Sequence, residues 1–315
     1  MPQDLPQWRH NPDQPTDFGP QFSYTHTNHH AQSESMNPQL LSELADAVNR
    51  MPAFPKSVQK VLELAQDERS TPRDLVLVID KDPVLTVRML KIVNSAYYRL
   101  PKRISSIGQA VVYLGFNATK NLALGMAAIG MLPTSSNDGF DWHAYLVHSL
   151  TTAAIAKQLA TKSQATDALD CFVAGLLHDF GKVVFARTMP TQFAHALQLC
   201  ARDQSSLHLA MRETMGADHT VTGAMLLERW RFAPDLVDTV RNQFGSPVQD
   251  SGSIACVFAA NQISKKLKLG FAGNPFVSDL PAPLAARLGG DLDSLIAGLD
   301  DLTALHEETK LFARI

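Results

Sequence analysis

From Pro38 onward, apolar residues recur every three or four positions, which is the spacing of a helix with one buried face. We find no convincing run that alternates apolar and polar residues as a half-buried strand does. The first 36 residues differ, because they contain five prolines and many Gln, Asn and Ser but few aliphatic side chains. Such a segment buries too little apolar surface to offset its ordering entropy. We therefore expect a disordered tail over 1–36, followed by an all-α fold.

Residues that can cap the first turn of a helix precede most of the periodic segments. The expected caps are Thr71, Asp82, Ser106, Asn117, Asp141 and Asp167. The helix after Asp167 is expected to reach His178, with Gly181 near its end. Further helices are expected over 191–202, 206–215, 219–231, 235–244 and 253–268, with a last helical pair in 284–312. A polar loop at 133–139 divides the chain, so we expect an N-terminal helical half over 37–135 and a second half over 136–315.

Composition and charge limit which classes of partner and which cellular location are expected. The net charge is -3, and there is no excess of Lys and Arg of the kind that neutralises phosphates, so nucleic acid is not the expected ligand. No apolar stretch approaches the roughly 20 residues of a membrane span, and we expect no membrane association. The three cysteines form no CxxC pair, which is typical of buried thiols in a reducing compartment. The N-terminus is too polar for a signal peptide, so the cytoplasm is the expected location.

Two stretches of the chain resemble one protein family. The first spans Met51 to Gly115 and contains DPVLTVRMLKIVNSAYY and ISSIGQAVVYLG. The second contains HSLTTAAIAKQLA, GLLHDFGKVV and GADHTVTGAMLLERW. Both are similar to HDOD domains, which are relatives of the HD-type metal phosphohydrolases. The resemblance implies a multi-helix bundle in two helical halves and a regulatory or output role in bacterial signal transduction.

The resemblance also implies a metal site. HD phosphohydrolases hold a divalent metal with a first His, an adjacent His-Asp pair and a distant Asp, and the metal acidifies the attacking water. In this chain His148 matches the first His, and His178 and Asp179 match the pair. His219 matches a His that two-metal relatives use as an extra ligand, although a supporting or helix-start role is the alternative.

Two departures from the family pattern weaken this site. Asn261 stands where the family usually has the distant Asp, and a neutral amide is a weaker ligand than a carboxylate. Gln243 and Phe244 stand where many relatives have a His pair. We therefore assign no catalytic residue and expect either no metal or a weakly bound divalent one, Mn, Fe, Zn or Mg. Alternatively, the two His and the Asp form a buried hydrogen-bonded cluster that joins two helices.

Two smaller clusters have plain interpretations. Lys265, Lys266 and Lys268 form a basic run that we interpret as a solvated helix face, with an anion site as the alternative. His26, His29 and His30 lie in the tail, where flexible histidines lack a preformed cage for a metal.

The sequence thus predicts a non-catalytic or weakly catalytic cytoplasmic signalling module. It would act by binding a signalling protein or a small ligand. One alternative is a metal-dependent phosphohydrolase that acts on a nucleotide or cyclic dinucleotide. The other is a sensor of a nucleotide second messenger.

Overall fold

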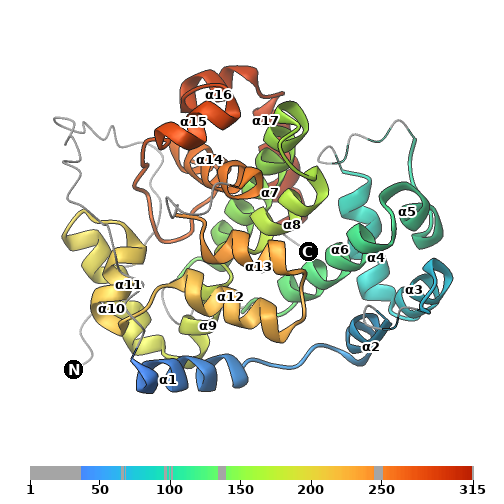
Figure 1. Cartoon of the computed structure of the whole chain (residues 1–315), viewed down its shortest axis with the longest axis horizontal. Helices are drawn as coiled ribbons and strands as arrows, with labels where there is room; N and C mark the ends of the chain where they lie inside the picture. The colour runs from blue at the N-terminus through green and yellow to red at the C-terminus, as the bar shows by residue number, and fades with distance from the viewer. Residues whose placement is uncertain are drawn as a thin grey trace.

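The computed structural model describes residues 37–64, 67, 69–95, 98, 100, 102–133, 140–244 and 251–313. These residues contain seventeen α-helices and no strand, which confirms the all-α prediction for the described part of the chain (Figure 1). The tail expected at 1–36, with its three histidines, lies outside the described residues, as does nearly all of the loop expected at 133–139.

The helices of the first part are α1 (Pro38–Asn49), α2 (Lys56–Leu64), α3 (Pro72–Ile79), α4 (Pro83–Val93), α5 (Ile107–Leu114) and α6 (Phe116–Ile129). Those of the middle part are α7 (Trp142–Ser163), α8 (Ala168–Leu177), α9 (Gly181–Thr188), α10 (Pro190–Arg202), α11 (Leu207–Met215), α12 (His219–Arg229) and α13 (Pro234–Arg241). The last are α14 (Gly252–Lys266), α15 (Ala282–Leu288), α16 (Leu292–Gly298) and α17 (Leu302–Ala313).

Side-chain caps start most of these helices where the sequence predicts them. Thr71 forms a reciprocal capping box with Asp74, and Ser106 accepts a bond from the backbone of Gln109. The caps at Asp82, Asp141 and Asp167 are also confirmed. The cap at Asn117 is wrong: α6 begins at Phe116, because Gly115 adopts a positive φ of 85° and turns the chain directly from α5 into α6.

Two helix assignments differ from the sequence prediction. Gly181 does not lie near the end of a helix but begins the short helix α9. The apolar residues after His178 do not by themselves indicate that a new helix starts there. The C-terminal pair is in fact three helices, because Gly289 ends α15 in a left-handed conformation and Asp291 caps a new helix, α16. A single residue with positive φ is enough to split a periodic segment in this way.

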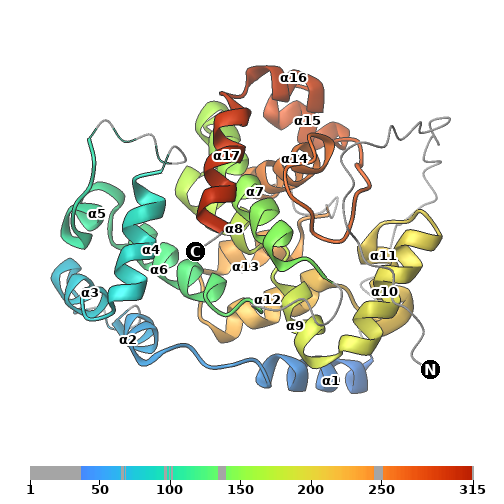
Figure 2. The same cartoon turned by 180° about the vertical axis from the view of Figure 1, so that it is seen from behind.

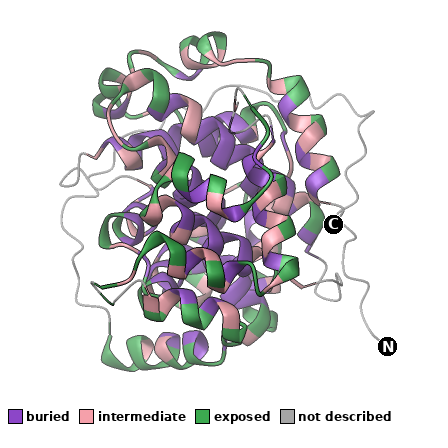
Figure 3. Ribbon diagram, turned by 90° about the vertical axis from the view of Figure 1, so that its right-hand side faces the viewer, coloured by how far each residue is buried: buried purple, intermediate pink, exposed green. Residues whose placement is uncertain are grey.

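Helix α7 lies at the centre of the molecule. It packs against α8, α14 and α17, and all of its residues from Val147 to Ala156 are buried. Figure 3 shows the buried residues gathered in the interior of the molecule. Helices α2 to α6 lie to one side and join this core where α6 packs on α8 (Figure 2).

Helix α1 leads the chain but packs on α9 and α12 of the second part. The guanidinium of Arg229 donates to the backbone oxygen of Val48, and the Phe54 and Trp230 rings lie 4.4 Å apart. The division at residue 135 remains a prediction, although α1, which precedes it, packs mainly on helices that follow it. No helix in the described part of the chain is long and apolar enough to cross a membrane.

Candidate functional site

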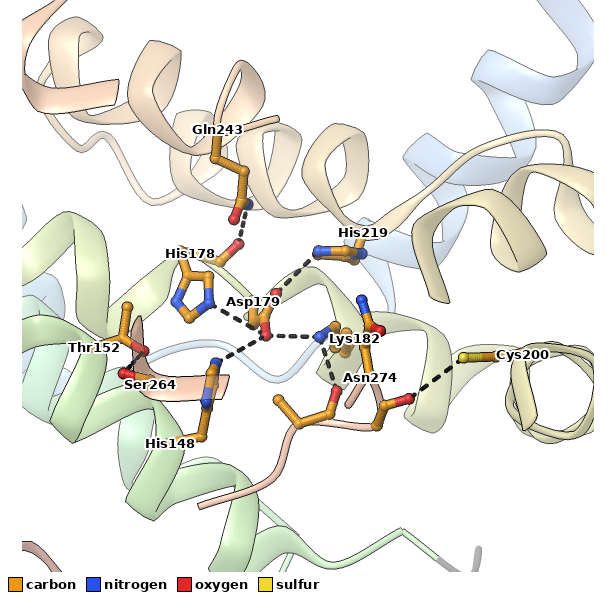
Figure 4. A network of polar contacts seen from close by, with 12 residues as sticks. His148, Thr152, His178, Asp179, Lys182, Cys200, His219, Gln243, Ser264 and Asn274 are labelled. Carbon is orange, nitrogen blue, oxygen red and sulfur yellow. Dashed lines mark hydrogen bonds and ion pairs between the residues drawn. The ribbon is translucent and has the colours of Figure 1, made fainter. Parts of the chain in front are cut away.

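Three residues expected to form the site converge in the structure. His148 lies on α7, and His178 and Asp179 form the turn between α8 and α9. One potential ligand atom from each lies within 4.8 Å of the other two, and all three side chains are at most 1% exposed. The expected convergence is therefore confirmed, and Figure 4 shows the cluster.

Asp179 is the centre of this cluster. Its Oδ2 lies 2.6 Å from Lys182 Nζ, 3.2 Å from His178 Nε2 and 3.8 Å from His148 Nε2. Its Oδ1 lies 2.9 Å from Nε2 of His219, the first residue of α12. One buried carboxylate is thus surrounded by one ammonium and three imidazoles (Figure 4).

Backbone contacts orient the His178 ring. Its Nδ1 lies 2.7 Å from the carbonyl oxygen of Gly175, so the ring donates that N–H there and turns its Nε2 toward Asp179. Metal-binding histidines are typically oriented in this way by a bond from the other ring nitrogen. The Gln243 amide donates to the carbonyl oxygen of His178 at 2.6 Å, which also fixes this turn.

The surroundings favour neutral His148 and His219 and a charged Asp179. Burial lowers the pKa of His148 well below its ordinary value, and neighbouring His178 lowers it further. Burial and then Lys182 lower the pKa of His219. Burial alone would raise the pKa of Asp179, but His178, Lys182 and His219 outweigh it and hold that pKa well below its usual range. Neutral imidazole and ionised carboxylate are the forms that bind metals.

Several polar atoms around Asp179 are buried without a hydrogen-bond partner in the described structure. They include His148 Nε2, His178 Nε2, both ring nitrogens of His219, Gln243 Oε1 and Asn261 Oδ1. Buried polar groups are nearly always satisfied in native proteins, and a group of exceptions indicates a water molecule or an ion. The two His and Asp179 could therefore hold a cation between them.

The remaining expected positions add no strong metal ligand. The Phe244 ring stacks on His208 at 4.2 Å and meets the His219 ring edge-on at 5.5 Å. Asn261 is buried on α14, one turn before Lys265. Neither Phe244 nor the Gln243 amide, which is bonded to the backbone, provides an additional strong ligand.

Two lysines of the site were not predicted from the sequence. Lys182 is buried and contacts Asp179, which lies three residues before it in the segment GLLHDFGK. The prediction of a solvated face is wrong for Lys265, which is half-buried, whereas Lys266 and Lys268 are exposed. Burial, followed by the neighbouring charge of Lys182, lowers the pKa of Lys265 to about 8. The spacing of four residues between Asn261 and Lys265 places both on the same helix face.

Lys265→Met should stabilise the protein near neutral pH. The pKa of Lys265 is lowered from 10.5 to about 8, so between these values the unfolded chain binds more protons than the folded one, and wild-type stability rises with pH. The variant should gain ~1–3 kcal/mol at about pH 7 and lose this advantage progressively above about pH 8. Urea unfolding at about pH 7 and about pH 9.5 measures the difference. Exposed Lys266, changed to Met, is the control; an equal gain there, or a gain independent of pH, would contradict the assignment.

Comparisons with known proteins identify the family of the chain. The model of the HDOD domain family matches residues 51–244. An uncharacterized protein of Treponema pallidum (strain Nichols) is 26% identical over 215 residues, a match that covers 68% of this chain and 41% of that protein. The chain thus spans about two fifths of the length of this curated relative.

Solved structures share the fold. An HDOD domain protein from Geobacter sulfurreducens is 23% identical, with a TM-score of 0.69 over 89% of this chain and 98% of that one. A protein named as a candidate phosphohydrolase from Shewanella amazonensis SB2B is 25% identical, with a TM-score of 0.67 over 86% and 97%. Because the family match covers more than half of the chain and the predicted motifs lie inside it, the protein belongs to the HDOD domain family.

Proposed function

We propose that the chain is a non-catalytic regulatory module that acts by binding a signalling protein. The observation that carries the proposal concerns Gln243 and Phe244, which stand where many relatives have a His pair and which make contacts within the fold. The Gln243 amide is bonded to the His178 carbonyl oxygen at 2.6 Å, and the Phe244 ring packs against His208 and His219. The side of the site that would hold a second metal is therefore filled with groups that stabilise the fold.

The residues fit a single divalent metal only in part. His148 Nε2, His178 Nε2 and an Asp179 carboxylate oxygen would hold it, and a metal bound there would acidify a water molecule. The fourth position carries Asn261, so the donor set supplies one negative charge against the two of a dication. Loss of a supporting group commonly lowers metal affinity by roughly 10–100-fold, and loss of a direct ligand lowers it by as much or more. Any metal, Mn, Fe, Zn or Mg, is accordingly expected to bind weakly.

A metal-dependent phosphohydrolase is the second candidate function. The convergence of two His and one Asp favours it, as does the name of the Shewanella relative. Its substrate would be a nucleotide or a cyclic dinucleotide. A nucleotide second messenger could also be bound without hydrolysis, as a signal rather than a substrate.

Purified protein without an affinity tag should not hydrolyse an aryl phosphodiester or cyclic dinucleotides with Mn²⁺, Fe²⁺, Zn²⁺ or Mg²⁺. The physical reason is the incomplete ligand set. The release of aryl alcohol and of linear dinucleotide should equal that of buffer with metal alone, and His178→Ala and His148→Gln should give the same rates. Turnover by the wild type that disappears in both variants would establish the hydrolase and overturn the regulatory proposal.

A further inference from the structure

The Lys182 ammonium lies where a cation bound to Asp179 would be expected. Its Nζ is 2.6 Å from Asp179 Oδ2 and 2.8 Å from the carbonyl oxygen of Ala272, and the side chain is 3% exposed. Figure 4 shows it reaching the carboxylate from the side opposite His178. The ammonium therefore has both a charged and a neutral acceptor in the interior of the protein.

The oxygen that Lys182 contacts is also the one nearest to both candidate metal-binding imidazoles. His178 Nε2 and His148 Nε2 both approach Asp179 Oδ2, at 3.2 Å and 3.8 Å. A metal held by these two nitrogens and this oxygen would share the oxygen with the ammonium. Two cations on one oxygen repel each other strongly, because little water is present to screen them in the interior.

The Asp179–Lys182 pair is neutral without a metal. Asp179 carries one negative charge and Lys182 one positive charge, and a buried carboxylate requires such a partner. A dication would leave the pair with excess positive charge, which the neutral amide of Asn261 does not reduce. To bind there, a metal would have to displace the ammonium and break its bond to Ala272.

We propose that Lys182 is the resident cation of the site: it neutralises Asp179 in place of a divalent metal and keeps the metal affinity of the His148, His178 and Asp179 triad low. This inference rests on the proposed non-catalytic role of the same site, and it offers a physical reason why the site would lack a tightly bound metal. The His148, His178 and Asp179 side chains keep an arrangement that could bind a metal, and the Lys182 ammonium competes with the metal for the Asp179 carboxylate.

The test is metal affinity in Lys182→Met and Lys182→Gln, which remove the charge and keep most of the side-chain volume. Zn²⁺ and Mn²⁺ are titrated calorimetrically into tag-free protein whose helix content has been checked by circular dichroism. Both variants should bind one ion at least ~10-fold more tightly than the wild type, the scale of a change in a supporting group. Adding His178→Ala to Lys182→Met should abolish the gain.

Lys265→Met is the matched control, since it removes an interior positive charge for which the described structure shows no direct contact with Asp179. It should raise metal affinity less than Lys182→Met does. If Lys182→Met is too unstable for titration, Zn²⁺ should raise its melting temperature and leave that of the wild type unchanged.

Equal metal affinity in the wild type and both Lys182 variants would overturn the inference, as would tight stoichiometric metal binding by the wild type. These outcomes are separate from failure of the proposed function, which would appear as phosphodiester hydrolysis by the wild type.

Discussion

Asp179→Asn should lower the free energy of unfolding by roughly 3–5 kcal/mol, one of the largest effects of any single substitution in this chain. The substitution preserves shape but removes the negative charge beside the buried Lys182 ammonium, which is left with neutral oxygens as its partners. It also replaces one carboxylate oxygen with an NH2 group, so Lys182 and His219 cannot both keep an oxygen neighbour at this side chain. Urea unfolding followed by circular dichroism measures the loss.

A double-mutant cycle separates the charge pair from other contributions. Lys182→Met alone should cost less than Asp179→Asn, because three imidazoles remain near the carboxylate. The double variant should be more stable than the sum of the single losses predicts, by about 2 kcal/mol, since neither charge is then buried alone. Asp238→Asn, which changes an exposed acid on α13, is the control and should change stability by less than ~1 kcal/mol. A loss at Asp179 no larger than that of the control would show that the pair does not stabilise the fold.

Gly181→Ala should prevent stable folding. A Cβ at this position would overlap the carbonyl oxygen of His219 and lie 2.7 Å from the backbone nitrogen of Gly223, and neither backbone atom can move without shifting α12. An added atom in an overpacked core usually lowers the free energy of unfolding by ~1–3 kcal/mol. Here the overlap is with backbone atoms, so we expect the free energy of unfolding to fall by more than ~4 kcal/mol. Yield of soluble protein and the melting temperature measure the effect.

Gly223→Ala tests the same close contact between α9 and α12 with a milder overlap. Its Cβ would lie 3.3 Å from the Gly181 backbone nitrogen and from a Val240 methyl group, a tight contact that a small shift relieves. We expect a folded protein that is less stable by ~1–3 kcal/mol. Gly108→Ala, whose Cβ would meet nothing closer than the Ser106 hydroxyl at 3.8 Å, should leave stability unchanged or raise it slightly. Equal melting temperatures for Gly181→Ala and Gly108→Ala would show that α9 and α12 do not pack as closely as described.

Helix positions were predictable because caps and periodicity are local signals. Thr71 and Asp82 illustrate this, since each cap is followed by proline and an apolar face. Gly181 was misassigned for a non-local reason: its lack of a side chain serves the contact with α12, about 40 residues away, and does not end a helix. Local patterns do not reveal which segment will pack against a glycine.

The site was only partly predictable. The resemblance placed His148 beside His178 and Asp179, which periodicity alone does not require. Lys182 and Lys265 were missed because a lysine in a sequence is normally expected to be exposed. Their inward orientation depends on Asp179 and on the packing of α14, which a single sequence does not specify.

The contacts around Asp179 join positions 148, 179, 219 and 272, which are far apart in the chain. Bringing them together closes long loops, and this entropy cost must be met before the contacts can form. Individual helices can form earlier, from their own caps and local pairs. We therefore expect the cluster to be completed late, after the main barrier to folding has been crossed. Contacts that are absent from the transition state slow unfolding more than they speed folding, so we expect the Asp179 cluster mainly to lengthen the lifetime of the folded state.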